Sequence, residues 1–351
     1  MHSTLPPEKT KTYAPLSGTL FWIILLVSIA PLFLMTAVAA YEFNTAYRVK
    51  AVAYLDELVE KHARNVDGFL VEKEAEVRML SLTRDAAELS DEAVLSSLLS
   101  ALQKNHGGVF VDLGFVNAGG RQVAYAGPYS LKGADYSKAP WFARAMRDEK
   151  YISDVFTGLR GLPHFIVAIR KDTPAGPFVL RGTIDFAAFN LLVENITTGS
   201  TGLAFIINRE GEFQTRPRVP LDSRAAAIRD AVWKSSPAKL PPRRYRSWEA
   251  FTGSAARDER PAFHFMGSSP GDGRRAIYVT ATLKAGEWAL VYLQDEAETF
   301  ASLYTARNVT VAVLLLGGLA IAFMAAVLSR RVAGKMGRIA REKELMNEKV
   351  I

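Results

Sequence analysis

The sequence predicts an α+β protein in which a long N-terminal helix and two tandem antiparallel-sheet units stand between two transmembrane helices. Two long apolar windows near the ends of the 351-residue chain predict the transmembrane helices. A stretch with helical periodicity follows the first window, and short strand-like runs separated by turn residues fill most of the remainder. Runs of strands with few helices between them favour the α+β class.

The first apolar window covers residues 18–41, with no charged residue between Lys11 and Glu42. A helix needs about 20 apolar residues to cross the hydrocarbon core of a bilayer. A cleaved signal peptide is the alternative, because residues 37–39 read Ala-Val-Ala, a small-x-small cleavage pattern. The apolar run is longer than the roughly 7–15 residues of the apolar region of a signal peptide. We therefore predict an uncleaved transmembrane helix.

The second apolar window covers residues 309–328 and ends just before two arginines. Basic residues also precede the first window, and segments rich in Lys and Arg stay in the cytoplasm. Residues 1–17 and 329–351 are therefore expected in the cytoplasm, and residues 42–308 outside it. Part of the net charge of +7 lies in the C-terminal tail. A basic tail beside an apolar span fits an anionic lipid surface, so we expect the bilayer as a partner and no nucleic acid.

The composition excludes several kinds of chemistry. The chain contains no cysteine, so disulfides, thiolate nucleophiles and Cys-ligated zinc are absent. His164 and His264 stand in apolar strand-like runs without a second ligand at metal spacing, and we interpret them as core or edge residues. The glycine pairs are interpreted as turns, since none precedes a helix in a phosphate-binding unit. We predict no metal, no cofactor and no catalytic residue; an extracytoplasmic enzyme is the weaker alternative.

Residues 42–104 are expected to form one long extracytoplasmic helix. Its buried seam is predicted from side chains that recur at alternating steps of four and three residues, namely Leu55, Val59, His62, Val66, Phe69, Lys73, Val77 and Leu80. His62 and Lys73 interrupt this apolar pattern. The helix could pack only along its own domain, or also pair with a second subunit. We expect both, in a parallel homodimer.

Two sheet units are predicted after this helix, over residues 105–200 and 201–305. The first unit has expected strands at 109–117, 121–126, 151–156, 164–170 and 178–185, and expected helices at 141–147 and 186–196. The second has expected strands at 203–208, 212–216, 261–266, 275–283 and 288–294, and an expected helix near 224–235. The two units do not align as a sequence repeat.

Short motifs in the first unit resemble the double Cache sensor family. Residues 135–142, D-Y-S-K-A-P-W-F, resemble its Y-S-x-R-P-W-F stretch. Residues 151–154 resemble the strand that follows, and residues 182–186, G-T-I-D-F, resemble the strand end that carries a Gly and an Asp. The resemblance covers about residues 42–305. It implies two PAS-like Cache units, of which the membrane-distal one binds a small extracytoplasmic molecule and the proximal one relays the change.

The resemblance also implies a ligand site in the first unit. In amino-acid-binding members, an Arg two residues before the Trp holds the ligand carboxylate, and an acid at the position of Asp185 holds its ammonium group. Here Ala139 occupies the Arg position. The implied ligand-binding residues are Tyr136, Lys138, Trp141, Phe142, Asp154, Arg170 and Asp185.

The residue types at this implied site favour the cationic end of a small molecule. Asp185 and an aromatic wall can bind a cation by ion pairing and cation–π contact, so we expect an amine or an amino-acid-like ligand. Lys138 or Arg170 would have to replace the missing Arg for a carboxylate. The alternative interpretation is that Trp141 and Phe142 are core residues, and that Asp154 and Asp185 cap or turn the local backbone.

Residues 341–351 resemble the linker that leads into the dimerisation helix of bacterial sensor histidine kinases. This resemblance implies the input portion of a two-component sensor in a bacterial inner membrane, with its sensor region in the periplasm. All five histidines precede the second apolar window, so we expect no phosphoacceptor and no catalytic domain within residues 1–351. The input portion of a methyl-accepting chemotaxis receptor or of a cyclic-dinucleotide enzyme is the alternative.

Overall fold

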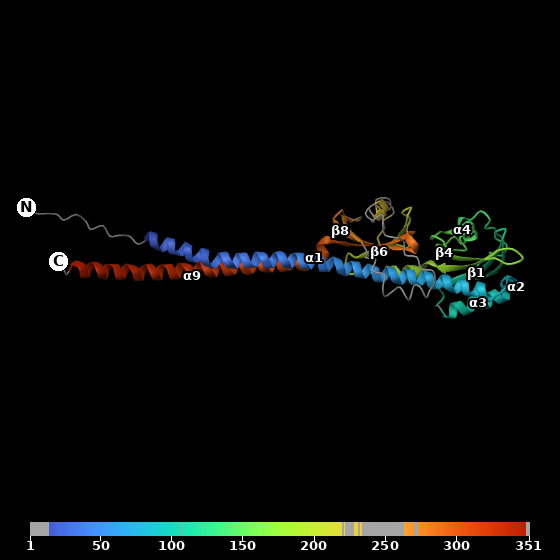
Figure 1. Ribbon diagram of the computed structural model, residues 1–351, viewed down its shortest axis with the longest axis horizontal. Helices are drawn as coiled ribbons and strands as arrows, with labels where there is room; N and C mark the ends of the chain where they lie inside the picture. Colours follow the sequence, from blue (N-terminus) through green and yellow to red (C-terminus); the bar gives the residue numbers. More distant parts are fainter. Residues whose placement is uncertain are drawn as a thin grey trace, which may run out of the picture. The chain divides into compact units, whose positions relative to one another are not determined.

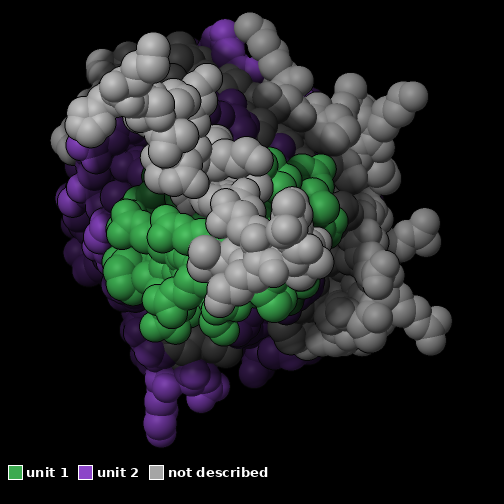
Figure 2. Space-filling view, turned by 90° about the vertical axis from the view of Figure 1, so that its left-hand side faces the viewer, with its two compact units in different colours: residues 1–50, 300–351 green, residues 51–299 purple. Residues whose placement is uncertain are grey.

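The computed structural model describes residues 14–105, 107–219, 221, 228–230, 232–233, 263–269 and 273–348. The chain divides into two compact units (Figures 1 and 2). Residues 1–50 and 300–351 form one, here called the helical unit, and residues 51–299 form the other, called the sheet unit.

The helical unit contains the two apolar segments that the sequence predicts. Helix α1 (Ala14–Thr83) begins in this unit, and helix α9 (Ala301–Glu348) fills its second part. Both helices are long and apolar enough to cross a membrane. Large apolar side chains such as Phe33 and Phe323 are exposed on them. Exposed apolar surface of this extent is unfavourable in water and suits lipid as the surrounding solvent.

Helix α1 continues into the sheet unit and buries one face there. Leu55, Val59, Val66 and Val77 of the predicted seam are buried within the same chain. Lys73, which interrupts the seam, is also buried, and its ammonium group lies 2.8 Å from Glu72 and 3.0 Å from Glu76. The ion pairs explain why a lysine is tolerated in this face, because a buried charge must be paired. The seam therefore packs along its own chain, and the homodimer stays a prediction.

The expected single helix to residue 104 is three helices in the structure. After α1 come α2 (Ala86–Ser90) and α3 (Glu92–Asn105). Asp85 has extended backbone angles and forms a capping box, in which its carboxylate accepts from Glu88 N at 2.8 Å and its own N–H donates to Glu88 at 3.1 Å. Asp91 starts α3 in a similar way by accepting from Ala93 N at 2.8 Å. The helical spacing of apolar residues continues through this segment, but the polar caps at Asp85 and Asp91 divide it into separate helices.

The first sheet has five antiparallel strands in the order β2-β1-β5-β4-β3. Its strands are β1 (Phe110–Asn117), β2 (Gln122–Ala126), β3 (Lys150–Ile152), β4 (His164–Lys171) and β5 (Phe178–Asp185). Helix α4 (Pro140–Asp148) covers one face, and α1 and α3 lie on the other (Figure 1). Helix α5 (Phe186–Glu194) follows β5. The expected strand 151–156 is shorter here, although residues 153–156 still bond to β4 through Ser153 and Phe156.

The second sheet has four antiparallel strands in the order β6-β9-β8-β7. Its elements are β6 (Leu203–Asn208), β7 (Phe263–Ser268), β8 (Arg275–Leu283), the 3-10 turn η3 (Lys284–Gly286), β9 (Trp288–Asp295) and α8 (Glu296–Thr299). The expected strand 212–216 is reduced to one bridge, from Phe213 to Ile207. Most of the expected helix 224–235 lies outside the described residues. A long helix, two antiparallel sheets and flanking apolar helices confirm the predicted α+β class.

Candidate functional site

Helix α4 brings an aromatic wall onto the first sheet. Pro140 occupies its first turn, where a missing N–H costs no hydrogen bond, so the helix starts directly before Trp141 and Phe142. Both side chains are buried against β1, β4 and β5. The ring of Tyr136 stands edge-on to Trp141, with 5.0 Å between centroids. Trp141 and Phe142 are thus core residues, and Trp141 in addition faces a cavity.

A buried ion cluster lies beside this wall, on the same face of the sheet. Asp112 of β1 has no exposed surface and sits opposite Thr183 of β5. Its carboxylate accepts from Thr183 Oγ1 at 2.6 Å, from Arg181 Nη1 at 2.9 Å and from Arg160 Nη1 at 3.0 Å. The Tyr125 hydroxyl adds a fourth, longer contact at 3.3 Å. One carboxylate therefore holds two guanidinium groups, and the three ionised groups together carry a formal charge of +1.

A small cavity of about 20 Å³ lies between the aromatic wall and this cluster. It is lined by Tyr136, Trp141, Phe156, Arg160, His164 and Arg181, among others. The Arg181 guanidinium carbon lies 5.3 Å from the centre of the Tyr136 ring. The cavity therefore offers aromatic faces together with N–H donors. This combination suits a small molecule that has an apolar body and an anionic group.

His164 is held in its neutral form at this cavity. Burial lowers the pKa of His164 to about 4, and repulsion by Arg160 and Arg181 adds to this against the opposing effects of Leu162 and Asp112. Nδ1 of the ring lies 2.8 Å from the carbonyl oxygen of Leu162. A carbonyl only accepts, so in the neutral ring the proton sits on Nδ1. At neutral pH the positive charge of the cavity comes from the two arginines alone.

The structure brings two of the seven sequence-predicted site residues to this cavity. Tyr136 and Trp141 line it, and Phe142 packs next to Trp141 at 5.9 Å between ring centroids. Asp185 instead caps α5, where its carboxylate accepts from Ala188 N at 2.8 Å. Lys138 is exposed.

The other two predicted residues lie elsewhere in the sheet unit. Arg170 donates to the Met146 carbonyl and to Asp172. It lines a separate polar groove of about 970 Å³ along α1, in which Lys150 pairs with Glu74. Asp154 contacts the second sheet. Around the cavity, then, the structure places no carboxylate of the predicted set.

Comparison with known proteins identifies the fold. A family profile described as a Cache domain matches residues 43–303, well over half of the chain. The chain belongs to the double Cache family. This confirms the resemblance that the motifs around Trp141 predicted. Among curated proteins, none matches the sequence significantly.

Solved Cache structures resemble this chain in fold. The ligand-binding domain of the Pseudomonas aeruginosa PAO1 amino acid chemoreceptor PctB, in complex with L-Arg, aligns with a TM-score of 0.52 at 16% identity, covering 76% of this chain and 98% of that one. The extracellular domain of the putative histidine kinase mmHK1S-Z3 gives 0.49 at 13% identity, covering 72% and 98%. The ligand-binding domain of the Pseudomonas fluorescens chemoreceptor CtaA, in complex with L-isoleucine, gives 0.48 at 16% identity, covering 74% and 98%.

Sequence reasoning missed Asp112, Arg160 and Arg181 in this Cache unit. A signal for two of them was present, because Asp112 is the only charged residue of the apolar strand run 110–117, and Arg181 lies inside the apolar part of the run 178–185. A charge in a buried strand has to be paired or to serve a site. Arg160 had no such signal, since it stands in a loop that only tertiary structure brings to β1.

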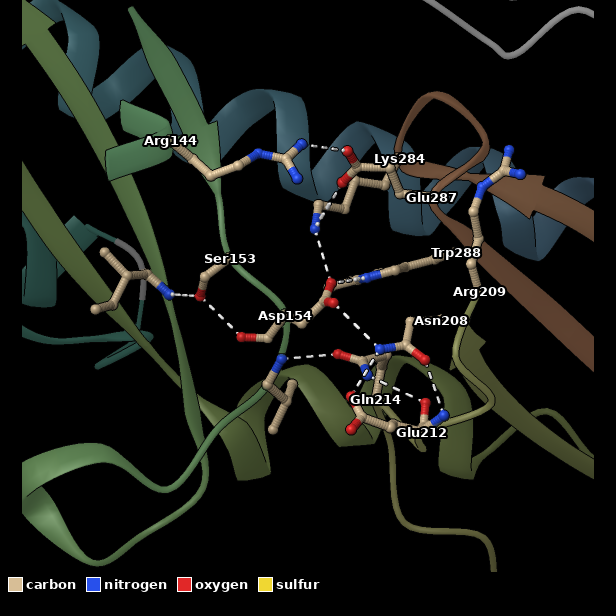
Figure 3. Close-up of polar contacts among 12 residues, drawn as sticks. Arg144, Ser153, Asp154, Asn208, Arg209, Glu212, Gln214, Lys284, Glu287 and Trp288 are labelled. Atoms are coloured by element: carbon tan, nitrogen blue, oxygen red, sulfur yellow. Dashed lines mark hydrogen bonds and ion pairs between the residues drawn. The ribbon is translucent and has the colours of Figure 1, made fainter. Parts of the chain in front are cut away.

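A second polar assembly joins the two Cache units at Asp154 (Figure 3). Oδ1 of Asp154 accepts from Lys284 Nζ at 3.0 Å and from Trp288 Nε1 at 2.6 Å, and Oδ2 accepts from Asn208 Nδ2 at 3.1 Å. Burial raises the pKa of Asp154, but the charge of Lys284 and these hydrogen bonds offset it and hold the pKa below its usual range. Asp154 is therefore an ionised contact between the first Cache unit and three elements of the second.

The neutral state of His164 predicts a pH dependence of stability. The folded pKa is below the ordinary value of 6.5, so the unfolded chain takes up the proton first as the pH falls. The free energy of unfolding should therefore decline from about pH 6.5 toward pH 4. Urea unfolding of the whole chain in lipid nanodiscs should show this decline, and His164→Gln should flatten it. An unchanged slope in His164→Gln would show that another group titrates.

Proposed function

We propose that this chain is the sensing portion of a membrane-bound sensor histidine kinase of the bacterial inner membrane. In this proposal the Cache region lies in the periplasm, binds a small molecule and passes a ligand-dependent conformational change across the membrane. Membership of the Cache family and the two flanking apolar helices support the sensor role. The kinase output is supported by the resemblance of residues 341–351 to a kinase linker. A chemotaxis receptor or a cyclic-dinucleotide enzyme is the alternative output.

The cavity between Trp141 and Arg160 is the observation that carries this proposal. It combines buried aromatic faces with two guanidinium groups, on the face of the first sheet that α4 covers. A volume of about 20 Å³ holds little more than one water molecule. A ligand must therefore displace part of the lining, and this is how binding can favour one conformation over another.

The loop that carries Arg160 is the part of the lining best suited to move. Gly158 and Gly161 flank it with φ angles of 55° and 69°, which glycine adopts without strain. Leu159, between them, is 67% exposed although it lines the cavity. Among the residues that the structure describes, Arg160 donates one hydrogen bond, to Asp112. Its other N–H groups can meet a ligand.

We propose a ligand with a carboxylate, recognised by Arg160, and an apolar body packed against Trp141 and Phe156. The sequence-based expectation of an amine relies on Asp185. In the structure Asp185 caps α5, and Asp112 already accepts four contacts. A cationic group at the cavity would meet two arginines instead. An amino acid fits this site through its carboxylate, consistent with L-Arg in the PctB complex.

Matched sets of compounds test this ligand class in the whole chain in lipid nanodiscs. Each set contains an amino acid, its deamino acid and its decarboxylated amine, for example phenylalanine, 3-phenylpropionate and phenethylamine. We expect at least one acid to raise the melting temperature by roughly 5–10 °C at a hundredfold excess over Kd. The amine of the same set should have no effect, because the charge of the cavity is positive.

Two variants make this experiment specific. Arg160→Gln should remove the shift caused by the acid, whereas Arg147→Gln on the exposed side of α4 should keep it. If only amines raise the melting temperature, and Asp185→Ala abolishes that effect, the ligand is a cation and the carboxylate assignment is wrong.

Membrane topology gives a separate test of the sensor role. The charge bias around the two apolar segments predicts that Asp172 and Arg338 lie on opposite sides of the membrane. Alkaline phosphatase fused after Asp172 should be active, and fused after Arg338 inactive, with a cytoplasmic fluorescent reporter giving the reverse result. The same compartment for both positions would contradict a two-span sensor.

A further inference from the structure

Two walls of the ligand cavity are connected to one turn of the second Cache unit. Phe156 lines the cavity, and two residues earlier Asp154 accepts a hydrogen bond from Lys284 Nζ at 3.0 Å. Trp141 lines the cavity from α4, and one turn later on the same helix Arg144 lies 3.0 Å from Glu287. Lys284 and Glu287 are in turn 3.1 Å apart. Figure 3 shows these ion pairs: Arg144 and Asp154 of the first Cache unit both contact the turn between β8 and β9, through Glu287 and Lys284.

The segment that carries Asp154 and Phe156 is fixed to both sheets. Ser153 N donates to Ile166 O at 2.9 Å and Phe156 N to His164 O at 2.9 Å, so both ends of the segment follow β4. Between them, Val155 N donates to Gln214 Oε1 at 2.7 Å. These hydrogen bonds connect Phe156 at the cavity to Asp154 and its donors in the second Cache unit.

The turn itself has an unusual backbone. Lys284 and Ala285 have φ angles of 48° and 55°, in the left-handed region that disfavours side chains. Conformations of this kind persist only where the surroundings hold them. Here Lys284 N donates to Asp67 of α1 at 2.9 Å, and the Lys284 side chain is 8% exposed, beneath its two carboxylate partners. The side chains of the Arg144–Glu287 pair are 42% and 40% exposed, so this pair contributes less and Lys284 is the main support.

The turn also leads directly to the parts of the chain that continue into the helical unit. Strand β9 starts at Trp288 and is followed by α8 and α9. Asp67, which accepts from Lys284, belongs to α1, the other helix that continues there. One residue thus contacts the segment behind the cavity, the helix α1 and the strand that precedes α8.

We propose that Lys284 is the positioning residue that couples the ligand cavity of the first Cache unit to β9 and α8. This deepens the sensor function proposed above and rests on it. Lys284 holds the strained turn in place as long as Asp154 keeps its present position. A change at Phe156 or Trp141 moves Asp154, releases the turn and alters the start of α8.

The test replaces the ligand by a change in the cavity wall, so it does not depend on knowing the ligand. Because the chain has no cysteine, Ala297→Cys gives a single nitroxide site on an exposed position of α8. We expect Phe156→Ala to change the mobility seen in the electron paramagnetic resonance spectrum of the full chain in nanodiscs. In the Lys284→Met background, Phe156→Ala should produce no further change. Lys284→Arg, which keeps the charge, should restore the response.

Controls separate coupling from general loosening. Lys132→Met removes an exposed ion pair in the first Cache unit and should leave the response to Phe156→Ala intact. Phe115→Ala, a buried aromatic outside the cavity lining, should give no response that depends on Lys284. If Phe156→Ala does not fold, Phe156→Leu is used instead. If Lys284→Met does not fold, Asp154→Asn breaks the same ion pair from its other side. If Phe156→Ala changes the spectrum equally in the wild-type and Lys284→Met backgrounds, or in neither, the coupling proposal is overturned. The proposal of ligand binding is unaffected by this result.

Discussion

The buried carboxylate of Asp112 sets the constraint around which the first Cache unit is arranged. A charge without exposed surface costs several kcal/mol unless it is paired and hydrogen-bonded. The chain meets this cost with donors from β5, from β2 and from the loop that carries Arg160. The Arg160 contact ties this loop to β1, and the two guanidinium groups leave one excess positive charge at the cavity beside the aromatic wall of α4. A requirement of folding thus produces the chemistry that the proposed ligand would meet.

A small number of contacts also links the cavity to the second Cache unit. Trp141 and Phe156 form cavity walls, and each is within three residues along the chain of an ion pair that reaches the turn after β8. Binding energy can bias a distant element only if the two states make different contacts there. The Asp154–Lys284 contact is the element that we propose for this role, since Asp154 lies two residues from the cavity wall Phe156.

Periodicity predicted the architecture well, because strands and helices report their buried faces in the local pattern. The ligand site was harder to predict from the sequence. An aspartate at the junction of β5 and α5 can bind a ligand or cap the helix, and sequence alone does not separate the two; in the structure Asp185 caps. Arg160 and Lys284 stand in loops, so only tertiary structure shows their partners. Asp112 and Arg181 could have been found, as charges inside buried strands.

Hydrogen–deuterium exchange of the whole chain in nanodiscs, with and without the carboxylic acid that raises its melting temperature, tests the central claim most directly. Slower exchange is expected over residues 153–166, which include the Arg160 loop. An accompanying change is expected over residues 284–295, which belong to the second Cache unit. Protection limited to residues 153–166 would contradict coupling between the two Cache units. No change in either segment would contradict ligand binding at this cavity.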